Sequence, residues 1–247
     1  MTFSSRQHLR KLTSTKLTKG TSGSLGLTDH LAKIAELFIT RLLLSDINHS
    51  LDLNQFGSRP GMSTTHCLVN IVNFLAKSAD KSNSASTLIT TDFSKAFDRV
   101  DHSVVISKLF RLNPRDWLTP WIVDFLNGRT QCVRYRGCLS DWSPVTAGVP
   151  QGTRLGPVLF LVLINDALAS VGPQCWKYVD DMTIAESMPR GVATEAQPTL
   201  DTLVQWCTEN NMRLNIEKCH AMRVYFGKTM LQPLQLTINN QVCIRLR

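Results

Sequence analysis

The sequence predicts an α+β fold, in which an antiparallel sheet with helices packed on one face is preceded by a smaller helical part. Strand-like apolar segments end at Asp92 and at the pair Asp180 and Asp181, and they alternate with segments in which apolar residues recur at helical spacing. The chain has 247 residues and is 43% hydrophobic. It can therefore bury the core of one globular body with two subdomains.

The N-terminal residues 1–28 differ from the rest, because they contain Lys and Arg but no Asp or Glu and are rich in Ser and Thr. They lack helical or strand periodicity, so we expect them to be disordered. An amphipathic helix is predicted from residue 29 to about residue 51. Its apolar residues are Leu31, Ile34, Leu37, Phe38, Leu42 and Leu43.

A loop marked by Gly57, Pro60 and Gly61 follows this helix. Ser63 is placed to cap a second helix. The apolar residues of that helix are Leu68, Val69, Val72, Phe74 and Leu75. Residues 29–85 thus form the smaller helical part, and the sheet is expected within residues 86–247.

The three aspartates at the strand ends are the residues that suggest chemistry. Carboxylates that converge would repel one another unless a cation neutralised them. Magnesium is suited to this role, since it is a hard cation that binds carboxylates together with substrate phosphates, and Mn²⁺ is able to substitute for it. Two such ions about 3.5–4 Å apart can clamp the attacking and leaving oxygens of an in-line phosphoryl displacement. The alternative is a plain turn, which Asp also favours.

The remaining segments supply the other elements of an α+β fold. Residues 103–127 are predicted to form two helices, and residues 131–143 a hairpin. A loop at 148–152 precedes a helix at 155–169, because glycine and proline end the apolar pattern there. A further helix is predicted at 199–211 and a hairpin at 236–247.

The composition limits the setting of the protein. A net charge of +8 suits a polyanionic partner such as nucleic acid, although moderately basic proteins are common. The seven cysteines form no C-x-x-C pair, so we expect reduced thiols in a nuclear or cytoplasmic protein. No secretory leader is visible, and the longest apolar run, 158–164, is too short to span a bilayer. We therefore expect a protein that is not secreted and has no membrane partner.

Four segments in series resemble the palm motifs of reverse transcriptases. They are TTDFSKAFDRVDH, GVPQGTRLGPVLFLVLIND, KYVDDMTIAES and MRLNIEKCHAMRV, in the order of the family. The resemblance covers roughly residues 27–247 and is closest to the enzymes of non-LTR, LINE-like retrotransposons. It implies a polymerase palm over residues 86–247 and partial fingers over residues 29–85.

Two departures from the family pattern accompany this resemblance. Residues 23–26 stand where the family carries an R-P-I-S-like segment, so the triphosphate-binding arginine is missing. The chain also stops where the next palm element begins. We accordingly expect a truncated domain without a thumb, an endonuclease domain or a cysteine-rich tail.

The resemblance also implies roles for residues near the aspartates. Asp92, Asp180 and Asp181 would be the catalytic metal ligands, and the backbone carbonyl of Phe93 would be a further ligand. Phe97, five residues after Asp92, would select deoxynucleotides, because its ring would collide with a ribose 2′-hydroxyl. The alternative for Phe97 is an ordinary core position.

Four further residues are implied in nucleotide binding. Gln151 and Gly152 would line the pocket for the incoming nucleotide and the template base, although the same loop would also suit a plain helix start. Arg59 would lie near the template or the incoming nucleotide, and a solvated arginine is the alternative. Lys218 would donate a proton to the leaving pyrophosphate, whereas a lysine between a helix and a strand is commonly exposed.

The implied function is that of an RNA-directed DNA polymerase, which adds deoxynucleotides to a primer 3′-hydroxyl. Its partners would be an RNA template, a DNA primer and deoxynucleoside triphosphates, with two Mg²⁺ ions as cofactors. The alternative is a catalytically inactive retroelement remnant that binds nucleic acid nonspecifically. A group II intron maturase or a telomerase-like protein would share the palm, but no feature of the chain favours either. The sequence does not determine the oligomeric state.

Overall fold

A computed structural model describes residues 15–19, 24–27, 30–136, 138–150, 152–169, 174–189, 192, 194–225, 236–239, 241–242 and 244–245. The chain divides into two compact units, which we call the helical unit (residues 1–51 and 97–164) and the sheet unit (residues 52–96 and 165–247). Each unit is made of two separate stretches of the chain. The division at residues 28 and 85 stays a prediction.

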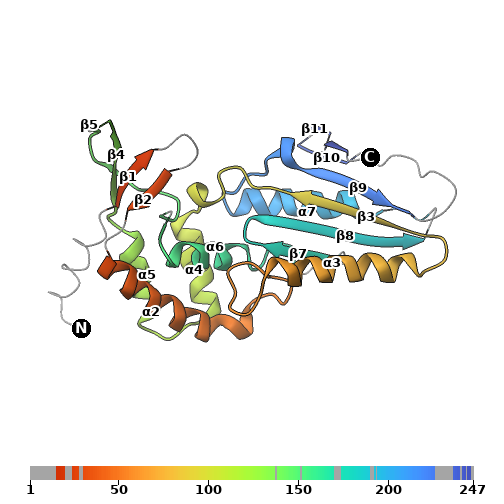
Figure 1. The fold of residues 1–247 in the computed structure, drawn as a ribbon, viewed down its shortest axis with the longest axis horizontal. Coiled ribbons are helices and arrows are strands. Elements are labelled where there is room, and N and C mark those ends of the chain that lie inside the picture. Colours follow the sequence, from red (N-terminus) through yellow and green to blue (C-terminus); the bar gives the residue numbers. More distant parts are fainter. Residues whose placement is uncertain are drawn as a thin grey trace. The chain divides into compact units, whose positions relative to one another are not determined.

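The sheet unit is built on an antiparallel sheet (Figure 1). Its described strands lie in the order β12, β9, β3, β8, β7, and each neighbouring pair is antiparallel except β12 with β9. Their bounds are β3 Ser84–Thr91, β7 Gln174–Tyr178, β8 Asp181–Pro189, β9 His220–Val224 and β12 Ile244–Arg245. A separate hairpin of β10 (Thr237–Ile238) and β11 (Gln241–Val242) confirms the predicted hairpin near the end of the chain.

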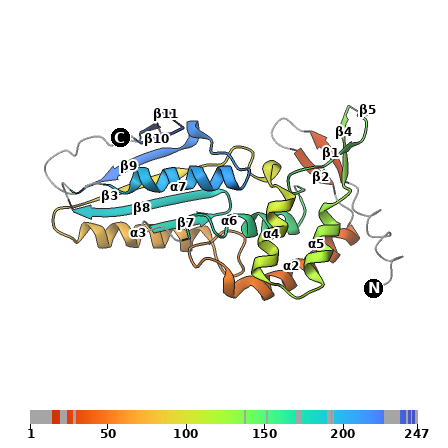
Figure 2. The same ribbon diagram turned by 180° about the vertical axis from the view of Figure 1, so that it is seen from behind.

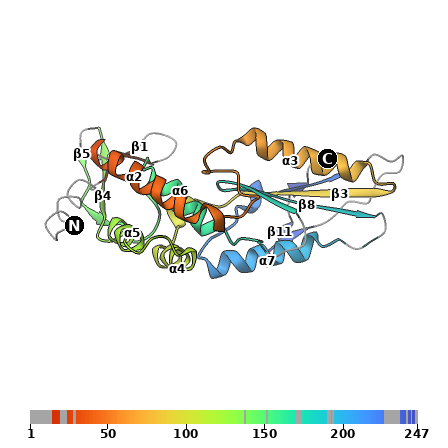
Figure 3. The same cartoon turned by 90° about the horizontal axis from the view of Figure 1, so that it is seen from below.

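Helices cover both faces of this sheet. Figure 3 shows α3 (Thr64–Ala79) and α7 (Ala196–Glu209) on opposite sides of β3 and β8. The predicted antiparallel sheet is thus confirmed, but its helices are not confined to one face. The reason lies in β3, where Leu88 packs in the cluster beneath α3 while Ile89, on the opposite face, is only 1% exposed. A strand with apolar residues on both faces needs cover on both.

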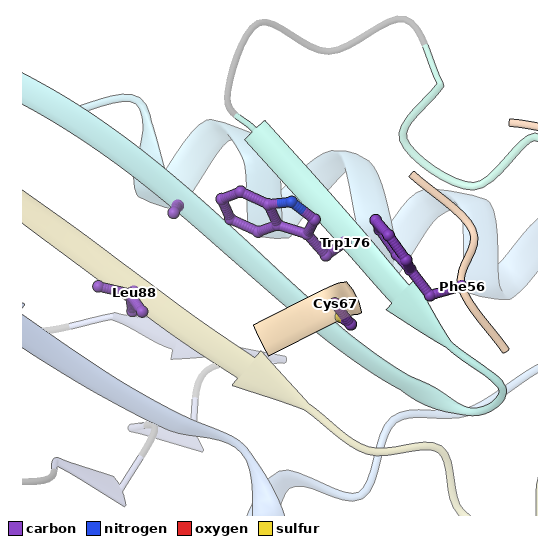
Figure 4. Packing of buried hydrophobic residues seen from close by; sticks show 5 residues of the cluster. Phe56, Cys67, Leu88 and Trp176 are labelled. Atoms are coloured by element: carbon purple, nitrogen blue, oxygen red, sulfur yellow. The ribbon is translucent and has the colours of Figure 1, made fainter. Parts of the chain in front are cut away.

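The core beneath α3 joins residues that are distant in the sequence (Figure 4). Phe56, Cys67, Leu88, Trp176 and Ala185 form its buried cluster. Ser63 caps α3, as predicted, by accepting a hydrogen bond from the backbone N–H of His66. Three of the apolar residues of α3, Leu68, Val69 and Val72, are about three-fifths exposed.

The helical unit surrounds one apolar helix, α6 (Leu155–Ile164), whose residues are buried apart from Pro157. Its other α-helices are α2 (His30–Ile47), α4 (His102–Leu112) and α5 (Leu118–Leu126), which Figure 2 shows from behind. The short 3-10 helices η1 (Asn48–Ser50) and η2 (Phe97–Arg99) belong to the same unit. Among the described residues, no helix is both long enough and apolar enough for a bilayer crossing.

The side of α2 that is buried differs from the one that the apolar pattern suggested. Leu31, Ile34 and Phe38 are at least half exposed. The buried residues recur at helical spacing and include one of the predicted apolar residues, Leu43, together with Ala32, Glu36, Ile39 and Ile47. An acidic residue therefore lies on the buried side of this helix.

Part of the predicted disordered leader is ordered as strands. β1 (Thr15–Lys19) pairs antiparallel with β2 (Ser24–Leu27) and parallel with β4 (Thr130–Tyr135). This pairing provides hydrogen-bond partners for the backbone N–H and C=O groups of these residues. The composition of the segment gave no indication of this pairing. β4 also pairs with β5 (Cys138–Leu139) and β6 (Ser143–Pro144), which confirms the hairpin predicted at 131–143. The remainder of the leader lies outside the described residues.

Candidate active site

The sheet brings the three aspartates to one edge. Thr91, the last residue of β3, pairs with Met182 of β8. Because the two strands are antiparallel, Asp92, which follows Thr91, lies beside Asp181, which precedes Met182. Asp180 lies in the two-residue turn between β7 and β8, since Tyr178 pairs with Asp181. Residues from distant parts of the sequence thus meet within the sheet unit.

The charges of these residues act on one another. The pKa of Asp181 is raised, first by burial and then by the negative charges of Asp180 and Asp92. Lys218 opposes this change, and its Nζ lies 3.2 Å from Oδ2 of Asp92. The lysine side chain is 66% exposed, whereas that of Asp92 is 19% exposed. An accessible cation therefore adjoins the half-buried carboxylate of Asp92, beside the half-buried Asp180 and the exposed Asp181.

The backbone that follows Asp92 is held by a second segment. Ser94 N–H donates to the carbonyl of Arg213 and Asn215 N–H donates to the carbonyl of Asp92, each at 2.8 Å. Phe93 forms an antiparallel bridge with Leu214 between these two bonds. In this type of pair the flanking residues make the hydrogen bonds, so the Phe93 carbonyl takes part in neither. It is the carbonyl that the sequence suggested as a further metal ligand.

The Phe93 side chain anchors the same segment from inside the sheet unit. Phe93 is 3% exposed, and its ring lies 6.1 Å from that of Trp206 in α7, tilted by 56°. Trp206 Nε1 donates to Oδ1 of Asp166 at 2.9 Å. The position of Asp92 is accordingly fixed by packing on one side and by backbone hydrogen bonds on the other.

Phe97 and Gly152 belong to the helical unit. The Phe97 ring stacks on that of Phe160 of α6, with centroids 4.9 Å apart, and remains half-buried. Gly152 has a φ of +84°, a conformation that favours glycine. Gln151 lies outside the described residues.

The loop that leads to Gly152 is tied to the segment around Phe97. Val149 N–H donates to the Phe97 carbonyl at 2.9 Å, and Gly148 N–H donates to the Val100 carbonyl at 2.8 Å. A Cβ at Gly148 would lie 2.9 Å from the carbonyl oxygen of Asp98, so only glycine fits this approach. Two segments that were predicted to contact nucleotide are thus neighbours.

Arg59 interacts with the backbone of its own loop in the sheet unit. Its Nη1 donates to the carbonyl of Asp52 at 2.9 Å and to that of Gln55 at 3.4 Å. These bonds give the guanidinium a role in loop structure. A contact of Arg59 with nucleotide stays a prediction.

Sequence reasoning missed several charged residues that the structure shows to be buried. Glu36 is 1% exposed, and its Oε2 accepts from the N–H groups of Arg154 and Leu155 at the start of α6, at 2.7 and 3.4 Å. Lys108 Nζ donates to the Leu163 carbonyl at the other end of α6, at 2.7 Å. Lys177, in β7, is fully buried and pairs with Asp52. The burial of Glu36 could have been suspected from its helical spacing from Ile39 and Leu43, which are buried on the same side of α2.

The aspartates supply the type of donor that a hard divalent cation prefers. Across the described ranges of the chain, no group of three or more His, Cys, Asp or Glu side chains has the arrangement of a formed metal site. The residues nevertheless suit a cation. Burial and then the charges of Asp180 and Asp92 raise the pKa of Asp181, and a bound cation would relieve the repulsion among the three carboxylates.

The same residues lie in a segment that matches a known protein family. Residues 22–239 match the profile described as "Reverse transcriptase (RNA-dependent DNA polymerase)". The chain belongs to the reverse transcriptase family. This confirms the predicted membership, and members of this family generally use divalent metal ions.

Relatives of this reverse transcriptase domain come from mobile elements. It is 33% identical over 201 residues to "RNA-directed DNA polymerase from mobile element jockey" of Drosophila melanogaster, covering 76% of this chain and 22% of the relative. With the protein of the same name from Drosophila funebris it shares 32% identity over 225 residues, or 86% of this chain and 24% of the relative. The chain thus spans about a quarter of these relatives. The names support the predicted non-LTR, LINE-like type.

Solved structures agree on the fold of the reverse transcriptase domain. Telomerase from Candida tropicalis, in complex with a fragment of telomeric RNA, aligns with a TM-score of 0.64 at 12% identity, covering 85% of this chain and 40% of that one. Telomerase from Candida albicans, also with an RNA fragment, gives 0.60 at 9% identity, covering 92% and 43%. At this identity the likeness confirms the polymerase palm fold and nothing more specific.

Proposed function

We propose that this domain catalyses RNA-templated addition of deoxynucleotides to the 3′-hydroxyl of a DNA primer. The observation that carries the proposal is the convergence of Asp92, Asp180 and Asp181 at one sheet edge, where burial and mutual repulsion raise the pKa of Asp181. A group of neighbouring carboxylates with a perturbed pKa is typical of functional sites.

Asp92, Asp180 and Asp181, with the Phe93 carbonyl, would hold two Mg²⁺ ions. Bound there, the ions would stabilise charge on the attacking and leaving oxygens of the displacement. The residues themselves orient the reacting groups, since phosphoryl transfer depends mainly on position and electrostatics. The backbone hydrogen bonds donated by Ser94 and Asn215 would keep Asp92 in place during the reaction.

Other residues of the domain would act on the nucleotide. Lys218, whose ammonium group adjoins Asp92 and is exposed, is suited to protonate the leaving pyrophosphate. Phe97 would reject ribonucleotides by its ring, which Phe160 holds in one orientation. Gln151 and Gly152 would contact the incoming nucleotide and the template base, and Arg59 would support the loop beside β7.

Primer extension tests the proposal. The purified chain is given an RNA template, a DNA primer, deoxynucleotides and Mg²⁺, and it is compared with Asp180→Asn and with Asp201→Asn. Asp201 is exposed on α7, so its variant makes the same charge change away from the acidic edge. We expect Asp180→Asn to lose at least 10²-fold in rate, as for removal of a key electrostatic group. Equal rates for the two variants would contradict the proposal.

A second candidate is an inactive remnant that binds nucleic acid through its net charge of +8. It predicts that neither the parent nor Asp180→Asn extends a primer, while the folded parent binds RNA and DNA with affinity that falls steeply with salt. Extension by the parent alone would exclude it.

A further inference from the structure

We propose that residues 52–59, which we call the bracing segment, position the turn that carries Asp180, and that Gly57 is the positioning residue that sets this turn. The inference deepens the proposed function and rests on it, because the aspartates are taken as the reactive edge. The bracing segment supplies no reacting group of its own.

The bracing segment pairs with β7 immediately before the turn. Lys177 N–H donates to the Asn54 carbonyl at 2.9 Å, and Phe56 N–H donates to the Lys177 carbonyl at 2.8 Å. Gln55 and Lys177 form a parallel bridge, and Gln55 is fully buried. The bracing segment therefore acts as an extra strand along the last residues of β7.

A buried ion pair fixes the register of this pairing. Lys177 Nζ lies 2.8 Å from Oδ2 of Asp52, with the lysine side chain 0% exposed, and it also donates to the Asn165 carbonyl at 2.9 Å. Asp52 N–H donates to Oδ1 of Asn165 at 2.8 Å. Because an uncompensated charge in this place would be expensive, the three groups hold one arrangement.

Gly57 brings the bracing segment against the turn itself. A Cβ at Gly57 would lie 2.2 Å from the backbone nitrogen of Val179 and 2.9 Å from the carbonyl carbon of Tyr178. Real Cβ atoms do not approach backbone so closely, and backbone atoms cannot rotate away as a side-chain end can. Any other residue at position 57 must displace the turn or the bracing segment.

The turn is in a conformation that needs such support. Val179 has a φ of +58°, which is unusual for a β-branched residue. Strained backbone persists only where the surroundings impose it, and it concentrates at functional sites. Val179 directly precedes Asp180 and Asp181, so a shift at Val179 moves both carboxylates relative to Asp92.

The test compares Gly57→Ala with Gly61→Ala, a matched change in the same loop. Gly61 has a φ of +77° and nothing within 4 Å of a Cβ, so its variant adds backbone strain without a clash. Mn²⁺ binding is followed by electron paramagnetic resonance, with Asp180→Asn as the background. We expect Gly57→Ala to lower the Mn²⁺ affinity about tenfold, as for changes behind metal ligands, and Gly61→Ala to leave it unchanged.

Primer extension separates positioning from general damage. A small displacement of a catalytic group can cost on the order of 10²-fold in rate. We therefore expect Gly57→Ala to lower kcat by that amount while the KM for deoxynucleotide stays near the parent value. If the parent binds Mn²⁺ but extends no primer, the proposed function fails, and the Mn²⁺ comparison still decides whether Gly57 positions the edge.

A second variant covers the case in which Gly57→Ala does not fold. Val179→Gly should fold, because glycine adopts a φ of +58° without strain, and it should bind Mn²⁺ several-fold more weakly, because the turn gains other conformations. Thermal melts establish that each variant is folded. The inference is wrong if folded Gly57→Ala, or Val179→Gly in its place, binds Mn²⁺ as the parent does.

Discussion

Charged groups gather around α6 in the helical unit and around the ends of β3 and β8 in the sheet unit. At α6, Glu36 accepts from N–H groups at the first turn, and Lys108 donates to a carbonyl of the last turn. Both charges oppose the partial charges of the helix ends. At the strand ends the neighbours of Asp181 include two further carboxylates, which raise its pKa together with burial.

The surroundings of α6 and the strand ends differ in which groups compensate the free-energy cost of holding charges in the fold. Around α6 the cost is partly offset within the fold, since the buried carboxylate and ammonium satisfy backbone groups that would otherwise lack partners. The offset is incomplete for Glu36, because its Oε1 is buried without a hydrogen-bond partner among the described residues and burial raises its pKa. At the strand ends the negative charges face one another, and Lys218 is the opposing charge that acts on Asp181. Repulsion retained in a folded protein is typical of a functional site rather than of a stabilising one.

The largest expected effect is that of removing Lys218. If the strand ends serve chemistry, Lys218→Ala should lower the rate of primer extension by roughly 10²–10⁴-fold, the usual contribution of a proton donor. Its unfolding free energy should change by only a few tenths of a kcal/mol, because an exposed ion pair contributes little. Extension assays and urea unfolding on the same preparations measure both.

Lys77→Ala is the control for this variant, since Lys77 is exposed in the last turn of α3. Lys218→Arg keeps a positive charge near Asp92 but is a poor proton donor, because guanidinium does not deprotonate in proteins. We expect Lys218→Arg to fold as the parent and to remain slow. A rate for Lys218→Ala equal to that of Lys77→Ala would remove the distinction between the two regions.

Removing Glu36 should give the converse result, a loss of stability. In Glu36→Ala the N–H groups of Arg154 and Leu155 lose their acceptor in a buried place, which costs about 1–3 kcal/mol of unfolding free energy. Glu36→Gln retains an amide oxygen and should lose less. Urea midpoints of the three proteins provide the measurement. Equal losses for the two variants would mean that the negative charge of residue 36, which both variants lack, stabilises the start of α6 rather than its volume or a neutral acceptor oxygen.

The sequence allowed the acidic edge to be predicted because each aspartate ends an apolar strand. An antiparallel sheet brings such ends together, and the pairing of β3 with β8 does so. The starts of α3 and α6 and the two hairpins were predicted because turn residues mark them. The helix that was expected at 155–169 ends at Ile164. The buried side of α2 was not predicted. Leu31, Ile34 and Phe38, which are exposed, fit an apolar stripe as well as the residues that are buried do.

The buried charges of Glu36 and Lys177 could not be predicted, because their partners are remote in the sequence. Glu36 binds the start of a helix more than a hundred residues further on, and Lys177 pairs with Asp52 across a similar distance. Neither pairing has a local pattern, so a charged residue among apolar ones gave no indication of its partner. The close approach of Gly57 to Val179 is likewise a property of the folded sheet unit.

The smallest expected effect is a difference in how stability depends on pH. The pKa of Glu36 is raised above its usual 4.5 by burial, while the N–H groups of Arg154 and Leu155 act to lower it. The folded protein therefore holds this proton more tightly than the unfolded chain does. Its contribution to stability is complete below pH 4.5 and is lost as the pH rises through the raised pKa. Glu36→Gln should consequently gain stability relative to the parent as the pH is raised from about 4.5 to 7.

Asp46 provides the opposite sign within the same helical unit. The hydrogen bond from Arg115 lowers the pKa of Asp46, so its contribution is present above the usual value of 3.8 and is lost as the pH falls through the lowered pKa. Asp46→Asn should thus lose stability relative to the parent at neutral pH and recover that loss in acid. Urea unfolding across this pH range measures both variants. Parallel curves for the two would show that burial of Glu36 does not oppose its ionisation, and that the carboxylate at α6 is held entirely by its hydrogen bonds.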